Sequence, residues 1–157
     1  MSSVEALVAQ DWQIRWYVYN FFIERERPPT ASEVAHTFSM SLDAAQASME
    51  RLDARHLFVL DKETRAVRIA NPLSAVPTGF RVHAAGRTYW ANCAWDALGI
   101  PAMLGSDARI EATITSATPG QDEPIAYQVR DGELLVPDLL VHFSLPLRHW
   151  YDDIVHT

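Results

Sequence analysis

Apolar side chains recur at helical spacing in the first third of the chain. The pattern predicts a helix over residues 4–26, a short helix that starts at Thr30, and a third helix from about residue 41 to 55. Pro28-Pro29 ends the first helix, and Thr30 with Glu33 forms a capping box at the start of the second. One stripe of the first helix is predicted to be its buried face, and it carries Trp12, Trp16 and Tyr19.

The spacing of apolar residues changes from helical to strand-like after the third helix. Residues 57–60 and 67–69 are predicted to pair as a hairpin around a turn at 61–64. Three helices followed by a hairpin is the outline of a winged helix, so residues 1–71 are interpreted as a helical, winged-helix-like lobe. Residues 72–79 contain two prolines and a glycine, and they are predicted to be a linker.

Residues 80–157 are predicted to form a second lobe in which short strands alternate with turn signals. A helix starts at Asn92, and Gly99 with Pro101 is expected to break or kink it. The predicted strands are residues 80–83, 87–90, 108–114, 125–129, 134–136 and 139–145. The fold class is therefore α+β, with an N-terminal three-helix lobe followed by a mainly antiparallel β-sheet lobe around that helix.

Composition and charge narrow the range of functions. Hydrophobic residues make up 48% of the chain and charged residues 21%, which is the balance of a soluble globular protein. The formal net charge of -7 opposes binding to nucleic acid and to anionic membranes. The single cysteine excludes an intramolecular disulfide, and neither a signal peptide nor an apolar run long enough to span a bilayer is recognisable. We therefore expect a cytoplasmic protein without nucleic-acid or membrane partners.

The single cysteine, Cys93, lies three residues before Asp96. On a helix this spacing places both side chains on one face. With Asn92 as the N-cap, Cys93 falls in the first turn, where the partial positive charge of the helix lowers the thiol pKa. Apolar neighbours raise the pKa of Asp96, so the pair combines a soft nucleophile with a proton donor. The residues expected to wall a cavity around Cys93 are Trp90, Trp95, Leu98 and Met103.

Other interpretations stay open. A lone cysteine in an apolar segment is often an inert core residue, and an aspartate in a first helical turn often serves only the helix dipole. Three histidines recur every seven residues near the C-terminus, but they do not follow a zinc-binding pattern. They are His142, His149 and His156. A winged helix is also typical of transcriptional regulators, although the candidate recognition helix, residues 41–55, is net acidic, which opposes DNA binding.

Residues 87–105 resemble the active-site segment of the organomercurial (alkylmercury) lyases. In that family the same Cys-x-x-Asp is followed by an apolar stretch, a Pro-Ala and a glycine, as Pro101-Ala102 and Gly105 follow here. The similarity extends to Ala108-Arg109-Ile110 and to the strand entry at Glu123-Pro124-Ile125. The N-terminal winged-helix outline also matches the family's first lobe.

The resemblance implies an enzyme that cleaves carbon–mercury bonds by protonolysis. Cys93 is then the thiolate that binds mercury, since soft sulfur suits so soft a metal. Asp96 is the acid that protonates the departing carbon, and it also helps to hold the inorganic mercury ion. The resemblance implies no required cofactor. The mercury ion is bound as product, and external small thiols or a mercuric reductase take it away.

The chain departs from the family pattern at the family's second catalytic cysteine. That cysteine follows the segment that corresponds to residues 142–157, and residues 113–116 stand where the family has a further cysteine. Two expectations follow: a shortened lyase whose second cysteine would come after Thr157, or a non-catalytic, thiol-dependent heavy-metal-binding protein on the same fold. With one protein thiol, mercury capture is expected to be weaker unless a small external thiol supplies the second ligand.

Overall fold

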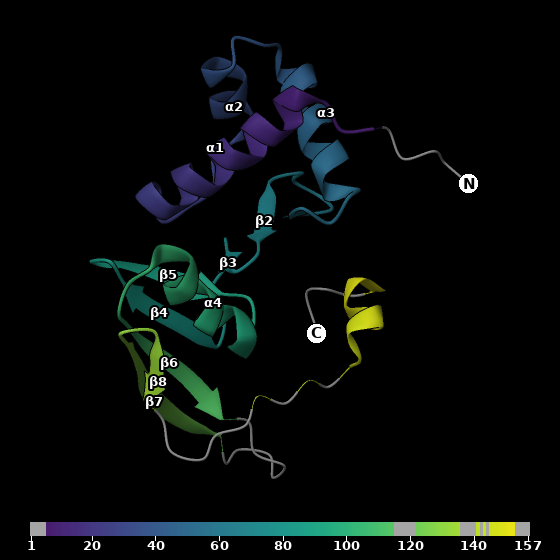
Figure 1. Cartoon of the computed structure of the whole chain (residues 1–157). Coiled ribbons are helices and arrows are strands. Elements are labelled where there is room, and N and C mark those ends of the chain that lie inside the picture. Colours follow the sequence, from purple (N-terminus) through teal and green to yellow (C-terminus); the bar gives the residue numbers. More distant parts are fainter. Residues whose placement is uncertain (1–5, 115–121, 136–140, 142, 144, 153–157) are drawn as a thin grey trace. The chain divides into compact units, whose positions relative to one another are not determined.

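A computed structural model describes residues 6–114, 122–135, 141, 143 and 145–152. The chain divides into two compact units, Met1–Asn71 and Pro72–Thr157 (Figure 1). Helices dominate the described part of the first unit, and strands dominate that of the second.

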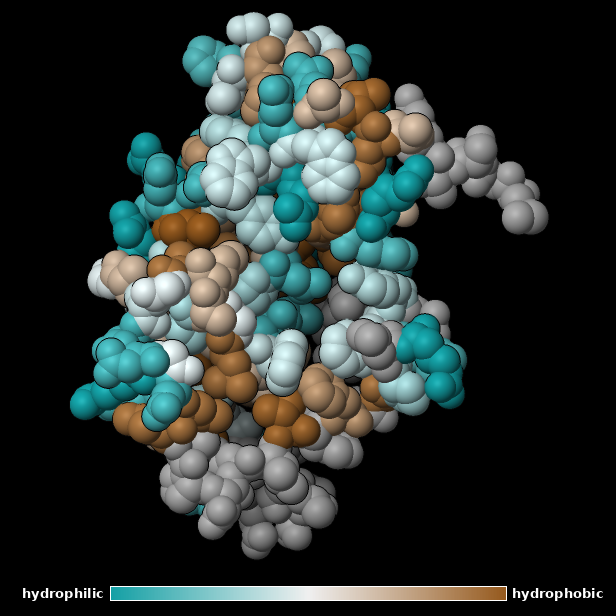
Figure 2. Space-filling model, viewed as in Figure 1, coloured by the Kyte–Doolittle hydropathy of each residue, from teal (hydrophilic) through white to brown (hydrophobic). Residues whose placement is uncertain are grey.

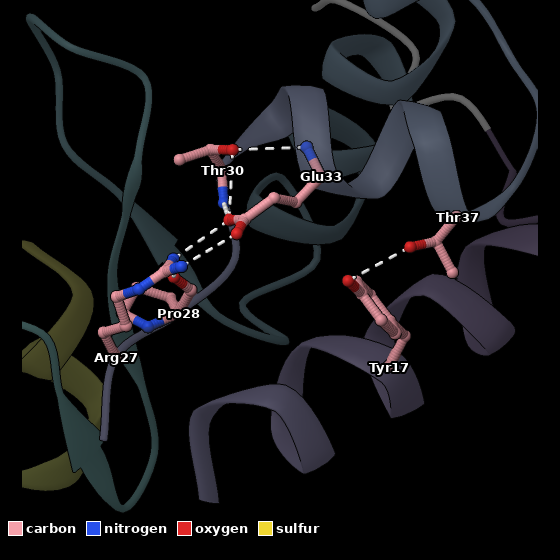
Figure 3. Close-up of polar contacts among 6 residues, drawn as sticks. All are labelled: Tyr17, Arg27, Pro28, Thr30, Glu33 and Thr37. Carbon is pink, nitrogen blue, oxygen red and sulfur yellow. Dashed lines mark hydrogen bonds and ion pairs between the residues drawn. The ribbon is translucent and has the colours of Figure 1, made fainter. Parts of the chain in front are cut away.

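The helices of the first unit begin where the sequence supplies caps. They are α1 (Ala9–Arg25), α2 (Ala31–Thr37) and α3 (Leu42–Asp53). The Thr30 hydroxyl accepts a hydrogen bond from the Glu33 N–H at 3.2 Å, and the Glu33 carboxylate accepts one from the Thr30 N–H at 2.7 Å (Figure 3). The predicted capping box is therefore confirmed. Ser41 caps α3 in the same way, accepting a hydrogen bond from the Ala44 N–H at 3.2 Å.

A short hairpin follows the three helices. Its strands β1 (Val59–Leu60) and β2 (Val67–Ala70) pair antiparallel. In the intervening turn the Asp61 carboxylate accepts a hydrogen bond from the Thr64 N–H at 2.8 Å. The order of elements agrees with the sequence prediction, and the assignment as a winged helix stays a prediction.

The buried face of α1 differs from the predicted one. Trp12 is 50% exposed and Trp16 is 72% exposed, whereas Tyr19 is half-buried. The core instead takes Ile14, Val18 and Phe22, which follow one another at four-residue spacing. The helix carries two apolar stripes, and packing against α2 and α3 decides which of them is buried. The residues from these helices that share the core include Val34, Ala45, Met49 and Leu52.

A buried carboxylate, Asp11, lies on the same face as this core stripe. It accepts hydrogen bonds from the Val8 N–H at 2.9 Å, from the Ser48 hydroxyl, and from Arg51 at 2.7 and 3.0 Å. Burial by itself raises the pKa of Asp11, but the hydrogen bonds from Arg51, Ser48 and Val8 outweigh it and hold the pKa below its usual value. The cluster therefore joins the start of α1 to α3 through a charged group.

The sheet of the second unit is antiparallel in every described pairing. Its strand order is β3-β5-β4-β6-β7-β8. The strands are β3 (Leu73–Ser74), β4 (Phe80–Ala84), β5 (Arg87–Ala91), β6 (Ala108–Ile114), β7 (Glu123–Arg130) and β8 (Glu133–Leu135). The predicted α+β class with a mainly antiparallel sheet is thus confirmed. Residues 72–79, predicted as a linker, include the buried strand β3 paired with β5.

Two tight turns set the register of the sheet. Ala85 and Gly86 have φ values of 50° and 74° between β4 and β5, and Asp131 and Gly132 have 52° and 79° between β7 and β8. Two successive residues with positive φ match the twist of a two-residue hairpin. Asp131-Gly132 therefore forms a tight turn between β7 and β8.

One helix, α4 (Ala94–Leu104), packs on the face of this sheet that carries the buried side chains of Val82, Tyr89 and Ile110. It runs without interruption through Gly99 and Pro101, so the expectation of a break is wrong, and the alternative of a kink stays a prediction. At Gly99 an added Cβ would lie 3.2 Å from the Cβ of Pro72, so the glycine lets the Pro72 ring pack closely against the backbone of α4. The predicted strand over residues 139–145 lies mostly outside the described residues, and Val141 and Phe143 are described without strand structure.

The surface of the second unit is partly apolar. Brown patches in the lower half of Figure 2 mark apolar residues on the described surface. The large exposed apolar side chains from the C-terminal part are Leu134, Leu135, Val141, Phe143, Leu145 and Tyr151. Among the residues that the structure describes, none of the helices combines the length and hydrophobicity that crossing a bilayer requires.

Candidate active site

The segment that carries the candidate site leaves the sheet at the end of β5. Ala91, the last residue of β5, is buried and pairs with Leu73 of β3. Its carbonyl also accepts a hydrogen bond from the Thr78 hydroxyl. Two independent contacts thus hold the chain just before Asn92 and Cys93, so the following residues leave the sheet from a defined position.

Cys93 is the N-cap of α4. Its φ and ψ of -146° and -178° are extended, and its carbonyl accepts the first helical hydrogen bond from the Ala97 N–H at 2.9 Å. The sequence predicts Asn92 as the N-cap and Cys93 within the first turn, and the helix begins one residue later than that. The pairing expected from the three-residue spacing is nevertheless present, because the Cys93 thiol donates to the Asp96 carboxylate with an Sγ–Oδ2 distance of 3.3 Å.

Burial raises the pKa of the Cys93 thiol to about 11, and the negative charge of Asp96 adds to the effect. The backbone N–H groups of Asp96 and Trp95 act in the opposite direction. The prediction of a lowered thiol pKa is therefore wrong. The helix N-terminus is present, but desolvation and the adjacent carboxylate outweigh it.

Burial also raises the pKa of Asp96, and the hydrogen bonds from Cys93 oppose the rise. The direction agrees with the sequence prediction. The structure therefore holds a thiol and a carboxyl group in contact and partly shielded from water. A proton shared by such a pair belongs to both groups, so their ionisations are coupled.

The four apolar residues predicted to wall the cavity lie in different surroundings. Trp95 is 59% exposed and Met103 is 38% exposed. The guanidinium carbon of Arg81 lies 5.7 Å from the centroid of the Trp90 ring. Trp90 also lines a shallow cavity of about 470 Å³ with Thr78 and Ile125. Leu98 lines another cavity of about 530 Å³. That cavity is walled further by Pro101, Ala102, Val129 and Leu134. The structure thus brings Cys93 and Asp96 together. It does not gather the four predicted wall residues around one cavity.

Sequence reasoning missed two aromatic residues near this site. The ring of Phe143 lies 6.4 Å from that of Trp95, and the ring of Trp150 lies 5.1 Å from that of Phe143. Trp150 belongs to a short 3-10 helix, η1 (Leu147–Asp152). No local pattern connects these residues to Trp95, because only the path of the chain back toward α4 places them together.

The histidine interpretation concerns residues that lie mostly outside the described part of the chain. His149 lies in η1, whereas His142 and His156 fall outside the described residues. Within the described part of the chain, no group of three or more His, Cys, Asp or Glu side chains is placed to hold a metal ion.

One protein family matches the segment of the chain that contains Cys93 and Asp96. The sequence profile of the alkylmercury lyase family, MerB, matches residues 73–157, which is more than half of the chain and includes Cys93 and Asp96. The chain belongs to this family. None of the curated proteins compared with the chain matches it.

A solved alkylmercury lyase family structure is similar to the chain over a longer stretch. It is a crystal structure of the mercury-bound form of MerB2, with a TM-score of 0.64 and 27% sequence identity. The similarity covers 83% of this chain and 60% of the MerB2 chain. The α+β fold is therefore that of the family, and the chain spans about three fifths of the length of MerB2.

Proposed function

We propose that this protein is an organomercurial lyase that cleaves carbon–mercury bonds by protonolysis. One observation carries the proposal: the Cys93 thiol donates to the Asp96 carboxylate at 3.3 Å, at the start of α4, in a chain of the alkylmercury lyase family. Cys93 is the mercury-binding nucleophile, and Asp96 is the proton donor. The substrate class is organomercurial small molecules.

The hydrogen bond supplies a route for the proton. Mercury bound to an organic group and an external thiolate is attacked by the Cys93 sulfur, and the thiol proton moves to Asp96 along the existing hydrogen bond. A sulfur–mercury bond forms. Asp96 then passes the same proton to the carbon as the carbon–mercury bond breaks, and the hydrocarbon leaves. One proton is used, and Asp96 returns to its carboxylate form.

The raised pKa of both groups suits this sequence of steps. A thiol with a pKa of about 11 keeps its proton at neutral pH until mercury replaces it. Burial of Asp96 makes its carboxyl form less unfavourable than in water, which helps it to carry the proton between sulfur and carbon. The two groups thus store one proton close to the bond that must be cleaved.

The product ion needs a ligand besides Cys93. The sequence contains one cysteine, so we propose that an external small thiol supplies the second sulfur and that small thiols or a mercuric reductase then remove the ion. No cofactor is required in this scheme. We also propose a cytoplasmic setting without nucleic-acid or membrane partners, in keeping with the net charge of -7.

A second candidate is a non-catalytic, thiol-dependent heavy-metal-binding protein. The single cysteine favours it, because one protein thiol can capture mercury without completing the ligand set that the family resemblance implies. The two candidates differ in one product: a lyase releases the hydrocarbon, whereas a non-catalytic binder does not.

The deciding experiment treats the protein with a simple organomercurial and excess small thiol. Intact-mass spectrometry detects mercury on the protein, and gas analysis detects the hydrocarbon. A lyase releases hydrocarbon, and Cys93→Ser abolishes the release. Asp43→Asn is a control for substitution at an exposed site, since Asp43 is a surface carboxylate in the first turn of α3. An adduct without hydrocarbon supports the binder. The absence of an adduct, with Cys93 unreactive until the protein is denatured, marks a buried core cysteine and refutes both.

A further inference from the structure

A shallow groove on the helical unit takes no part in the proposed reaction. Its volume is about 600 Å³, and it is formed by one side of α1 together with Phe38, the C-cap residue of α2. The described residues that line it are Trp12, Gln13, Trp16, Tyr17, Asn20 and Phe38. Four of these side chains are aromatic, two are amides, and none is charged. We call this surface the aromatic groove.

Contacts within the helical unit hold the base of the aromatic groove in place. The Tyr17 ring meets that of Phe38 edge to face at a centroid distance of 5.7 Å, and it lies 5.6 Å from that of Phe21. Its hydroxyl accepts a hydrogen bond from the Thr37 hydroxyl at 3.1 Å (Figure 3). Because aromatic pairs prefer these geometries, Tyr17 and Phe38 present a surface of fixed shape.

The two tryptophans of the groove face water. Trp12 is 50% exposed and Trp16 is 72% exposed. Neither indole N–H makes a hydrogen bond within the part of the chain that the structure describes. Contiguous exposed apolar surface of this kind marks an interaction site. The ligand that fits the groove is therefore apolar and uncharged, and it supplies hydrogen-bond acceptors.

A proline-rich segment in the polyproline II conformation has these properties. This conformation has no internal hydrogen bonds, so every backbone carbonyl can accept one. Proline has no N–H to donate, and proline-rich segments dock in aromatic-lined grooves. Trp12 and Trp16 are four residues apart, which separates them by about 6 Å along the axis of α1. Two residues of polyproline II advance by nearly the same length, about 6 Å, so each indole can meet a different proline.

Other occupants fit the groove less well. The acyl chains of a lipid bilayer would leave the amides of Gln13 and Asn20 without hydrogen-bond partners, which costs free energy. A second copy of the groove offers acceptors only through its amides and its Tyr17 hydroxyl. A polyproline segment instead offers a carbonyl at every residue.

We propose that the aromatic groove binds a proline-rich segment of a partner protein in the polyproline II conformation. The inference goes beyond the proposed function and does not depend on it, because neither Cys93 nor Asp96 lines the groove. It gives the helical unit a role as a docking surface for another protein.

The test titrates the whole chain with decaproline and follows the indole N–H resonances by nuclear magnetic resonance. The chain contains five tryptophans, and replacing each by phenylalanine in turn assigns its resonance. We expect the resonances of Trp12 and Trp16 to shift until the groove is saturated. Those of Trp90, Trp95 and Trp150 should stay in place. A peptide of the same length made of glycine and serine should shift none of them.

Variants then measure the contribution of each group. Trp16→Leu should raise the Kd of decaproline about tenfold, the size of one lost aromatic contact. Gln13→Leu removes an amide donor and should raise the Kd about threefold. Trp95→Leu is the matched control, because it removes a 59% exposed tryptophan from the other unit and should leave the Kd unchanged. An unchanged circular dichroism spectrum checks that each variant is folded.

Four results overturn the inference, and none of them bears on carbon–mercury cleavage. The first is the absence of shifts at Trp12 and Trp16 up to the solubility of decaproline. The second is a Kd that is the same in Trp16→Leu and Gln13→Leu as in wild type. The third is a dimer in sedimentation that Trp16→Leu dissociates and decaproline does not, which would assign the groove to a second copy. The fourth is binding of phosphatidylcholine vesicles at these two tryptophans that decaproline does not displace.

Discussion

Replacing Asp11 with alanine tests whether the buried charge cluster stabilises the helical unit. Asp11 is fully buried and receives hydrogen bonds from Val8, Ser48 and Arg51. The substitution removes the shared acceptor. The hydroxyl of Ser48 and the guanidinium of Arg51 lose this contact, and α1 loses the carboxylate that accepts from the N-cap N–H.

The size of the loss follows from the burial of each partner. Breaking a buried ion pair by removing one side costs about 3–5 kcal/mol. Arg51 is 20% exposed, so its guanidinium can recover part of its hydration in the variant. The expected loss is therefore at the lower end, about 3 kcal/mol.

The loss depends on pH in a defined direction. The folded pKa of Asp11 lies below the value of about 3.9 for an unfolded aspartate. A group with a depressed folded pKa stabilises the protein fully above its unfolded pKa, and the contribution disappears as the pH falls through the folded value. The difference between wild type and Asp11→Ala should therefore be constant near neutral pH and should narrow below about pH 4.

Urea unfolding followed by circular dichroism measures both effects. At a slope of roughly 2 kcal/mol/M, a loss of 3 kcal/mol lowers the midpoint at pH 7 by about 1.5 M. Asp43→Ala, which removes an exposed carboxylate from α3, should shift it by less than about 0.3 M. A shift at Asp11 no larger than this control, or one that is the same at pH 3 as at pH 7, would show that the cluster does not stabilise the fold in this way.

Four further predictions concern the second unit. Asp96→Asn should stop hydrocarbon release while mercury adduct still forms at Cys93 in intact-mass spectra; loss of both would make Asp96 a structural residue. Alkylation of Cys93 by iodoacetamide should accelerate about tenfold per pH unit between pH 7 and 10, because its pKa is about 11. Asp96→Asn removes a negative charge that raises this pKa, so alkylation at pH 8 should become faster, and an unchanged rate would contradict the coupling. Gly99→Val should destabilise the protein by about 2 kcal/mol in thermal unfolding, because its side chain would meet Pro72, and a neutral effect would mean that Pro72 can move away.

Local physical chemistry made several features predictable from the sequence. Thr30 and Glu33 cap α2 because their side chains reach only the nearest backbone groups. Asp131-Gly132 forms a tight turn because these residues accept positive φ. The contact between Cys93 and Asp96 joins the N-cap residue to the third residue of the helix, and the three-residue spacing places these side chains within reach of each other.

Packing between distant segments decided the rest. The first helix offers two apolar stripes, and only the fit against α2 and α3 buries Ile14 and Val18 in place of Trp12 and Trp16. Pro101 lies inside a continuous helix, although a break was expected near this residue. Neither outcome can be predicted from the sequence of one helix, because each depends on the elements that pack against that helix.

The thiol pKa shows most clearly what the tertiary structure decides. The sequence places Cys93 at a helix N-terminus, where the partial charge of the backbone lowers the pKa. Burial of the sulfur and its contact with Asp96 raise the pKa instead, to about 11. Likewise, Phe143 reaches Trp95 only because the chain returns toward α4. The sequence by itself determines which chemical groups are adjacent along a helix or turn. Long-range contacts exist only once the chain has folded. Desolvation also requires the folded chain, since it depends on which atoms exclude water.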